Sequence, residues 1–434
     1  MKGLAYHEAL EMILAQCAPC PAEEVPLAAA PGRVLHAPLL AAWDDPPSPK
    51  SGMDGFAIRA GDTAPASPAD PVRLPYARVT GAGHGLPPPL PPGGAMRAMT
   101  GALLPPGADC VLKWEDATWE GVGPETPAGG AGLPPGEAPP EGVLLITRPL
   151  QPGEHVIPPG RVLRAGQTLI PAGRVLDGQG LALLAGQGQA SCTVRRRPRL
   201  ALLALGDELV PPGQPLGPGQ IYVSNLQALA AIAARHGADP VSLGIAPDDP
   251  QVITGLLREA LEGAQPPDVV VTLGGSLHGA FDFAGTVQER LGARQHFRNT
   301  RLNMGGSTLF ASRGGQLFFG LSGAPMASWV AYEVLVRPAL WRMLGRQPAE
   351  RPQPRARLTE PLPLRPQRTH FIPARLDFAQ ASAAEPLPTV TPLARGTPVA
   401  LPPALLANGL IHWAEDAPPP EPGGVLPVEW LDIP

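Results

Sequence analysis

The second half of the chain alternates two apolar patterns. Continuous apolar runs predict buried strands at residues 200–205, 241–245, 268–273 and 317–321. Between them, apolar residues at helical spacing predict helices at residues 224–232, 250–262 and 326–340. Strands that alternate with helices form a parallel sheet buried on both faces. We therefore predict an α/β domain in this half of the chain.

Two of these helices carry more specific expectations. Ser224 is placed to cap the first, because a hydroxyl at that position accepts a hydrogen bond from the opening turn. In the second, one face is expected to hold the five apolar residues Val252, Ile253, Leu256, Leu257 and Leu261. The first feature predicts where a helix begins, and the second predicts which face of a helix packs on the sheet.

The rest of the chain predicts two helices and many short strands. Residues 4–16 have helical spacing that ends at Pro19, and a second helix is expected at residues 177–188. Short apolar runs broken by Gly and Pro predict a small β domain at residues 46–145, with a hairpin tip at 121–142. After residue 346 the strands lack a helical period, which predicts a small β-barrel or sandwich.

Composition supports folded cores. Gly and Pro account for 51 and 61 of the 434 residues, but the chain is 44% hydrophobic with a net charge of only −5, which argues against disorder. A near-neutral balance also argues against nucleic acid or a membrane surface as partner. Glu8 and Glu11 interrupt the N-terminal apolar pattern, so it indicates a helix rather than a signal peptide. We expect a soluble, cytoplasmic protein.

The four cysteines fit a reduced compartment. Cys17 and Cys20 have the spacing of a redox dithiol or half a zinc site, but the chain offers no second cysteine pair at that spacing. We interpret them as incidental thiols near a helix end.

Candidate chemistry gathers where the predicted parallel strands end. Ligands bind open parallel sheets at the carboxyl ends of their strands, and three loops qualify: 206–208, 274–279 and 322–325. Five carboxylates follow these strands and would repel one another without a counterion: Asp207, Glu208, Asp248, Asp249 and Asp282. A hard cation such as Mg²⁺, bridging to a phosphate, would relieve them. The alternative is that the acids cap helices and the glycines make turns.

These residues carry a resemblance. The chain resembles the MoeA family of molybdopterin molybdotransferases, whose eukaryotic relative is the E domain of gephyrin. The resemblance rests on six blocks in the family order: Ser51-Gly-Met-Asp-Gly-Phe-Ala57, Thr100-Gly-Ala-Leu-Leu-Pro-Pro-Gly-Ala-Asp109 with Glu115, Pro198-Arg-Leu-Ala with Gly206-Asp-Glu-Leu-Val210, Gly219-Gln-Ile-Tyr-Val-Ser-Asn225, Gly274-Gly275 with Asp282, and Leu321-Ser-Gly-Ala-Pro325.

The resemblance implies an architecture and a reaction. The architecture is an L-shaped homodimer whose subunits have four domains: residues 1–45 with 146–180, 46–145, 181–346 with a MogA-like three-layer α/β fold, and 350–434. The active cleft lies between the α/β domain of one subunit and the N-terminal domains of the other. The reaction inserts molybdate into adenylylated molybdopterin with Mg²⁺-dependent release of AMP, and other molybdenum cofactor assembly proteins are possible partners.

The resemblance also assigns roles to residues. It implies that Asp54, Thr100 and Glu208 are catalytic. The residues assigned to cofactor binding are Asp207, Gly274, Gly275, His278, Asp282, Ser322, Gly323 and Arg301. The residues assigned to Mg²⁺ are Asp249, Asp282 and Glu208. Simpler roles stay open: Asp54 as a turn former before Gly55, Thr100 as an ordinary strand residue, and Asp109 as a turn stabiliser.

Several departures from the family pattern fall in the chemistry. Both family lysine positions of the K-P-G-K-P stretch are uncharged here, as Asn303 and Gly306, and Ala324 replaces an asparagine. Only three of the 33 basic residues are lysine, yet a simple bias toward arginine would have placed Arg at these positions. Other departures are Gly160-Arg-Val162 for G-E-D, Leu205 for the threonine of T-G-D-E, and Gly274-Gly-Ser-Leu-His-Gly279 for G-G-V-S-V-G. Arg298, Arg301, Arg313 and His278 are the candidates to compensate.

Three hypotheses follow. The first is an active molybdotransferase. The second is a catalytically impaired paralogue that binds molybdopterin species or serves as a scaffold, which the missing lysine charges favour. The third is a Mg²⁺-dependent adenylyltransferase or nucleotide hydrolase that uses only the α/β domain, which the N-terminal blocks argue against.

Overall fold

The computed structural model describes residues 3–83, 85–120, 141–275, 283–362, 364–379, 387–393 and 406–431. The chain divides into two compact units, residues 38–170 and residues 1–37 with 171–434. Each unit is described by itself. The predicted hairpin tip falls largely on residues 121–140, which lie outside the described part of the chain.

A six-stranded sheet forms the centre of the larger unit, in the order β16-β13-β17-β20-β19-β18. The strands are β13 (Arg199–Leu205), β16 (Asp239–Ala246), β17 (Val269–Leu273), β18 (Arg294–Arg298), β19 (Leu309–Arg313) and β20 (Gln316–Leu321). The four strands expected from continuous apolar runs are parallel, as predicted. The prediction missed β18 and β19, which are antiparallel. Gly314 and Gly315, both with positive φ, make the tight turn that reverses the chain between β19 and β20.

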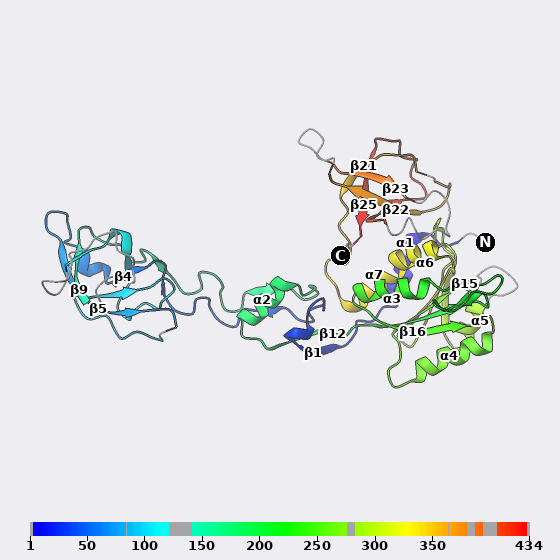
Figure 1. Cartoon of the computed structure of the whole chain (residues 1–434), viewed down its shortest axis with the longest axis horizontal. Coiled ribbons are helices and arrows are strands. Elements are labelled where there is room, and N and C mark those ends of the chain that lie inside the picture. Colours follow the sequence, from blue (N-terminus) through cyan, green and yellow to red (C-terminus); the bar gives the residue numbers. More distant parts are fainter. Residues whose placement is uncertain are drawn as a thin grey trace. The chain divides into compact units, whose positions relative to one another are not determined.

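Helices cover both faces of this sheet (Figure 1). These helices are α1 (Tyr6–Ala15), α3 (Asn225–Arg235), α4 (Pro250–Glu262), α5 (Phe283–Arg290), α6 (Pro325–Ala331) and α7 (Arg337–Leu344), whereas α2 (Gly178–Gly186) contributes to neither core beside the sheet. Apolar residues of α1, α3, α6 and α7 share one core with one face of the sheet, and α4 and α5 share a second core with the other. The α/β layering is therefore confirmed.

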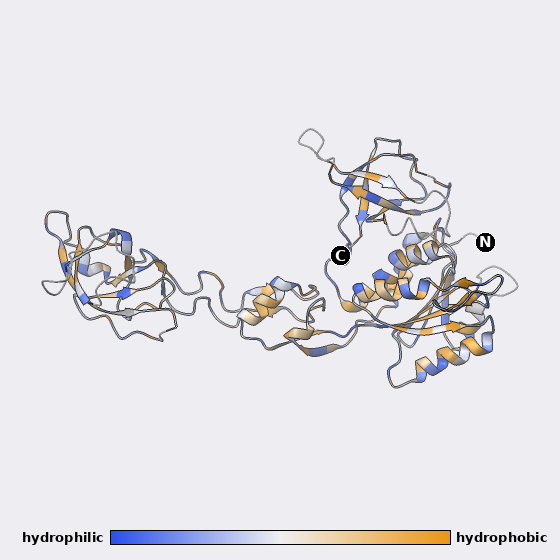
Figure 2. Cartoon of the chain, viewed as in Figure 1, coloured by the Kyte–Doolittle hydropathy of each residue, from blue (hydrophilic) through white to orange (hydrophobic). Residues whose placement is uncertain are grey.

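Two details of the predicted helices differ. Helix α4 shows an apolar and a polar side in Figure 2, and Ile253, Leu257 and Leu261 are buried, but Val252 is 41% exposed. Val252 precedes Ile253 by one residue and so points about 100° away from the buried face. Ser224 stands at the N-cap of α3, but among the described residues its side chain makes no capping hydrogen bond.

The last long helix contains a π-helical turn. The predicted helix at residues 326–340 begins one residue earlier and runs to Leu344, with the π turn η4 (Tyr332–Val336) between α6 and α7. This turn carries Glu333, which is 3% exposed. A buried carboxylate needs charged partners, because isolated charges are costly away from water.

Those partners come from the linker and the last strand. Arg351 donates to Oε2 of Glu333 at 2.8 Å and to Oε1 of Glu429 at 3.4 Å, and Arg337 donates to the same Glu429 oxygen at 2.6 Å. Arg351 also lies 2.9 Å from Nε2 of His236 on the cap of α3. Burial and the nearby arginines lower the pKa of His236 to about 2, so its ring is neutral.

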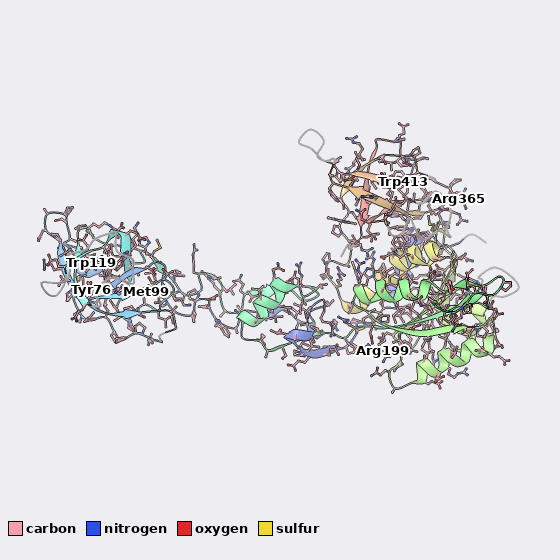
Figure 3. All side chains as sticks on the ribbon, in the orientation of Figure 1. Tyr76, Met99, Trp119, Arg199, Arg365 and Trp413 are labelled. Carbon is pink, nitrogen blue, oxygen red and sulfur yellow. The ribbon has the colours of Figure 1, made fainter. Side chains whose placement is uncertain are left out.

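The C-terminal segment forms a closed five-stranded barrel, so the open choice between barrel and sandwich is settled as a barrel. Its strands are β21 (Arg355–Leu358), β22 (His370–Asp377), β23 (Thr389–Pro392), β24 (Gly409–Trp413) and β25 (Val425–Trp430), in the order β21-β23-β22-β24-β25. Trp413 and Arg365 mark this part of the chain in Figure 3. Inward side chains such as Ile372, Val390 and Val428 fill the barrel.

The smaller unit is built around a second six-stranded sheet, in the order β7-β4-β6-β5-β9-β8. Its elements are β2 (Leu39–Leu40), β3 (Lys50–Ser51), β4 (Gly55–Ile58), η2 (Ala60–Thr63), β5 (Val72–Thr80), β6 (Ala95–Ala98), β7 (Cys110–Lys113), η3 (Trp114–Asp116), β8 (Thr118–Glu120), β9 (Glu141–Ile146), β10 (Val156–Ile157) and β11 (Thr168–Ile170). Phe56, Tyr76, Trp114 and Trp119 form its aromatic core. Figure 3 labels Tyr76 and Trp119, together with Met99 of the loop that follows β6.

Near the N-terminus, β1 (Ala22–Pro26) and η1 (Leu27–Ala29) follow α1, and β1 pairs with β12 (Ser191–Arg195). Burial raises the pKa of Cys17 to about 12 and that of Cys20 to about 11. Protonated thiols are poor nucleophiles and poor metal ligands, which agrees with the interpretation of these cysteines as incidental. In the part of the chain that the structure describes, no helix combines the length and apolarity needed to cross a membrane.

The buried ion pairs generate a stability prediction. Arg351→Ala leaves Glu333 buried without its 2.8 Å partner, so the free energy of unfolding should fall by about 3 to 5 kcal/mol. Urea denaturation followed by circular dichroism measures the change. Arg375→Ala is the matched control, because Arg375 is an exposed arginine on β22. Equal stability of the two variants would contradict the prediction.

Candidate functional site

In the smaller unit, Asp54 and Thr100 contact each other directly. Oδ1 of Asp54 accepts a hydrogen bond from the backbone N–H of Thr100 at 2.6 Å and from its hydroxyl at 2.7 Å. Asp54 is half-buried and Thr100 is exposed. The carboxylate therefore orients an accessible hydroxyl, with the hydroxyl proton directed at Asp54.

The two loops that carry this pair are fixed by backbone contacts. Asp54 precedes β4, where a Cβ at Gly55 would overlap the carbonyl oxygen of Leu112 on β7. Thr100 precedes Gly101, which has φ of 81° and donates to the carbonyl of Ser51 at 2.8 Å. Glycine is needed at both positions, for close approach at the first and for positive φ at the second.

Asp109, expected to stabilise the turn at Gly107, binds elsewhere. Its Oδ1 accepts a hydrogen bond from the backbone N–H of Ala60 at 2.7 Å. The side chain thus ties the loop before β7 to the end of β4, and it has a structural role in this unit.

In the larger unit, a first pocket of about 460 Å³ lies at the carboxyl ends of β13, β17 and β20. Residues of all three predicted loops line it, together with the start of α3: Gly206, Glu208, Gly274, Gly275, Gly323, Ser224 and Asn225. Tyr222 of β15 (Ile221–Tyr222), which pairs with β14 (Leu209–Val210), and Asp248 also line the pocket. The structure thus brings Glu208, Gly274, Gly275 and Gly323 together. Figure 3 labels Arg199, which begins β13 at the opposite end of the sheet.

Backbone groups form much of this first pocket. Gly274 has φ of 99°, and a Cβ there would come within 2.6 Å of the carbonyl oxygen of Leu205. Its neighbour Gly275 has φ of 68°. Helix α3 begins at the pocket, and the N–H groups of a first helical turn favour anions. A ligand with phosphate groups and a planar ring would suit such a surface.

Three carboxylates lie close together beside this pocket. Oδ1 of Asp207 accepts a hydrogen bond from the backbone N–H of Asp248 at 3.2 Å. Burial and the neighbouring charges of Asp207 and Glu208 raise the pKa of Asp248. These carboxylates therefore place negative charge at this edge of the sheet. Among the described residues, none of the three forms an ion pair with a basic side chain.

The other expected metal ligands lie elsewhere. Oδ1 of Asp249 caps α4 by accepting from the N–H groups of Gln251 at 2.7 Å and Val252 at 3.4 Å, so one carboxylate oxygen has a structural role. Asp282 and His278 lie outside the described residues. Within the described part, no group of three or more His, Cys, Asp or Glu side chains is arranged to hold a metal ion. The carboxylates near Asp248 are hard oxygen donors that suit Mg²⁺, but phosphate oxygens or water would have to complete its coordination.

A second pocket, of about 310 Å³, lies beside the first. Its lining includes Asn303 and Gly306, the two positions at which the resemblance leads us to expect lysine, and the hydroxyl residues Ser307 and Ser322. Arg368 also lines it. This arginine precedes the barrel strand β22, and it donates to the carbonyl of Leu302 at 3.1 Å. Among the described residues that line the second pocket, Arg368 is the cation.

The arginines expected to compensate for the lysines are elsewhere. Arg301 makes a bidentate ion pair with Glu415, with both hydrogen bonds at 2.7 Å, and it does not belong to the lining of either pocket. Arg313 pairs with Gln316 at the start of β20, at the end of that strand away from Ser322. Arg298 does not belong to the lining of either pocket. No local pattern in the sequence points to Arg368, because its hydrogen bond to the carbonyl of Leu302 joins segments 66 residues apart.

Backbone strain and an unpaired amide also mark the second pocket. Asn299, in the lining, has φ of 66°, and the neighbour of Arg368, Gln367, has φ of 61°. Residues other than Gly rarely adopt such values, and these conformations concentrate at functional sites. Oδ1 of Asn299 is buried without a hydrogen-bond partner among the described residues.

The Gly306 position is closed to any side chain. A Cβ on Gly306 would come within 2.5 Å of the carbonyl oxygen of Leu302 and 3.1 Å of that of Thr300. Its own carbonyl accepts from the N–H groups of Thr300 at 2.8 Å and Thr308 at 3.0 Å. The backbone path therefore has no room for a lysine at Gly306, whereas Asn303 presents a side chain to the lining of the pocket.

Comparison with known proteins identifies one family along most of the chain. Residues 4–188 match the family described as MoeA N-terminal region (domain I and II), and residues 201–342 match the one described as probable molybdopterin binding domain. The chain is 33% identical over 326 residues to the molybdopterin molybdenumtransferase of Nostoc sp., covering 74% of this chain and 70% of that protein. It is also 33% identical over 309 residues to that of Bacillus subtilis, covering 71% and 67%.

The fold is similar to a solved structure over its full length. The molybdopterin biosynthesis MoeA protein from Pyrococcus horikoshii superimposes with a TM-score of 0.83, at 29% identity and with 99% of each chain covered.

The acidic edge of the first pocket generates a pH-dependent prediction. The raised pKa of Asp248 means that its ionised form destabilises the fold, so Asp248→Asn should raise the free energy of unfolding at pH 7 by less than about 1 kcal/mol. The gain should disappear as the pH falls below the pKa of an unfolded aspartate, where the wild-type side chain is protonated in both states. Thermal unfolding across this pH range measures it. Asp239→Asn, at an exposed aspartate at the start of β16, is the control, and equal gains in both variants would contradict the prediction.

The second pocket generates a prediction about charge. Asn303→Lys should tighten molybdate binding about 10-fold, because a charged donor typically contributes about 1.5 to 3 kcal/mol. Gly306→Lys should instead lower thermal stability, because its Cβ overlaps the carbonyl of Leu302. Isothermal titration with molybdate and thermal unfolding separate the two effects. An increase in affinity without loss of stability for Gly306→Lys would show that the loop rearranges freely.

Proposed function

The chain belongs to the MoeA family of molybdopterin molybdenumtransferases, which act in molybdenum cofactor biosynthesis, and on that premise we propose that it inserts molybdate into adenylylated molybdopterin and releases AMP. The observation that carries this proposal is the pair of adjacent pockets at one sheet edge. One is lined by glycine loops and a helix start, and the other by an arginine, amides and hydroxyls.

The first pocket supports the binding of the adenylylated pterin. Its backbone N–H groups and the start of α3 suit phosphate oxygens, while Tyr222 supplies an aromatic wall for a planar ring. Mg²⁺, when bound, would neutralise the charge on the phosphates. Glu208 and Asp248, which line this pocket, are the described side chains that would hold it.

The second pocket supports the binding of molybdate. Arg368 supplies positive charge, and Ser307 and Ser322 supply hydroxyl donors for a tetrahedral oxyanion. In the overall reaction, two dithiolene sulfurs replace two oxygens on molybdenum, and these oxygens leave as two waters. The two thiols supply two of the four protons and the solvent supplies the other two, so the oxidation state is unchanged. The phosphoanhydride is hydrolysed to a terminal phosphate on the pterin and AMP.

Asp54 and Thr100 supply the proton chemistry in this proposal. The carboxylate accepts the Thr100 hydroxyl hydrogen at 2.7 Å, which leaves the hydroxyl oxygen free to accept a proton or a hydrogen bond from the substrate. A homodimer would bring this pair, on one subunit, to the pockets of the other. We propose that arrangement, and possible contacts with other cofactor assembly proteins, as part of the function.

A second function is favoured by one observation. Asn303 and Gly306 are uncharged, so Arg368 is the cation among the described lining residues of the second pocket, and the backbone at Gly306 is closed to a lysine. An impaired paralogue that holds molybdopterin species, or serves as a scaffold, would keep the first pocket and tolerate a weak second one.

Turnover separates the two functions. Purified protein is mixed with adenylylated molybdopterin, Mg²⁺ and molybdate, and AMP is measured by chromatography. Release of AMP with formation of active cofactor supports the enzyme, whereas tight pterin binding without AMP supports the paralogue.

Asp54→Asn tests the catalytic pair. It should reduce AMP release about 100-fold or more, because a positioned acid or base contributes about 10² to 10⁴ in rate. Asp70→Asn is the matched control, since Asp70 is an exposed aspartate of the same unit. Unchanged turnover in Asp54→Asn would remove this pair from the mechanism.

A further inference from the structure

One short loop forms a wall of both pockets. In the segment between β20 and α6, Gly323 and Pro325 line the first pocket and Ser322 lines the second. Ala324 lines both. The position of this common wall, residues 322–325, therefore sets the shape of two binding sites at once.

The common wall is held from one side by Asn225. Nδ2 of this residue donates to the carbonyl oxygen of Gly323 at 2.7 Å. Asn225 begins α3, is 8% exposed, and lines the first pocket but does not belong to the lining of the second. A short bond from a buried amide to a loop carbonyl fixes that loop against the helix.

On the other side the wall rests on the glycine loop after β17. The N–H of Gly274 donates to the carbonyl of Leu321 at 3.0 Å, and a Cβ at Gly323 would lie 3.4 Å from the Cα of Gly274. Within the wall, the N–H of Ala324 donates to Oγ of Ser322 at 3.2 Å. The methyl group of Ala324 adds no polar contact, so the Asn225 amide is the side-chain tether that the structure records between α3 and this wall.

We propose that Asn225 is a positioning residue for the second pocket, which it does not line, because it holds the common wall in its binding position. The inference rests on the proposed function, in which the two pockets take the nucleotide and the oxyanion. Gly and Ala lose much conformational freedom when ordered. The Asn225 hydrogen bond orders the common wall before any ligand binds. An oxyanion that binds to the wild-type protein therefore does not lose affinity to the entropy cost of ordering the wall.

Loss of the tether has a distinctive signature. Each ligand must then order the wall itself, and whichever binds first removes that cost for the other. A protein without the Asn225 amide should therefore show weak oxyanion binding that a nucleotide in the first pocket restores. A residue that only stabilised α3 would not produce this recovery.

The test measures molybdate binding to the full chain by isothermal titration, with and without saturating AMP. Wild-type protein should bind molybdate with less than about a twofold effect of AMP. Asn225→Ala and the isosteric Asn225→Asp, which cannot donate, should each weaken molybdate binding about three- to tenfold, the range expected from one hydrogen bond. Saturating AMP should return both to within about twofold of wild type. Gln227→Ala, an exposed amide on the same helix, is the control and should match wild type.

Other outcomes overturn the inference. Unchanged molybdate affinity in both Asn225 variants would show that the tether does not position the wall, and a loss that AMP does not restore would indicate a general structural role. Thermal unfolding of each variant shows whether it is folded, and Asn225→Asp preserves the packing if Asn225→Ala does not fold. Wild-type protein that binds neither probe would refute the proposed function and this inference together, whereas independent binding of both, unaffected by the variants, would refute the inference alone.

Discussion

A buried set of ion pairs joins the C-terminal barrel to the α/β sheet, and the second pocket depends on it. Arg351 of the linker and Glu429 of β25 meet Glu333 and Arg337 on the last long helix. Burial raises the pKa of Glu333 and lowers that of Arg337, so each charge remains favourable only beside its partners. Because the barrel is fixed in this way, the segment before β22 can place Arg368 against the loop that ends at Gly306.

The two pockets use different physical means to attract anions. The first uses backbone groups, which glycines at the strand ends leave accessible, and its excess of carboxylates calls for a cation. The second, as far as the structure describes its lining, uses one guanidinium and neutral donors. A single arginine carries less charge than the two lysines of the family pattern would add. Anion binding in this chain therefore depends more strongly on the geometry of the neutral donors.

The sequence predicted the parts of the fold that local patterns determine. Continuous apolar runs predicted the four parallel strands, and proline and glycine spacing predicted the β-rich segments. The antiparallel edge of the sheet, β18 and β19, was missed. The sequence of β18, Arg294–Arg298, is mostly polar and does not differ in pattern from a loop. The convergence of the loops after these strands on one pocket was predictable for the same local reason. Arg368 was not, because its position depends on how the barrel packs. The ion pair of Arg301 with Glu415 was not predictable either, because the two residues lie 114 positions apart in the sequence.

The closed backbone at Gly306 limits where further positive charge can enter the second pocket. Its carbonyl joins Thr300 and Thr308, and the space for a Cβ is filled by the carbonyl of Leu302. A side chain at this position would disrupt the loop before any charge on it could act. Asn303 already presents a side chain to the pocket. Redesign of the pocket for a stronger hold on anions would therefore begin at Asn303 and leave the Gly306 backbone unchanged.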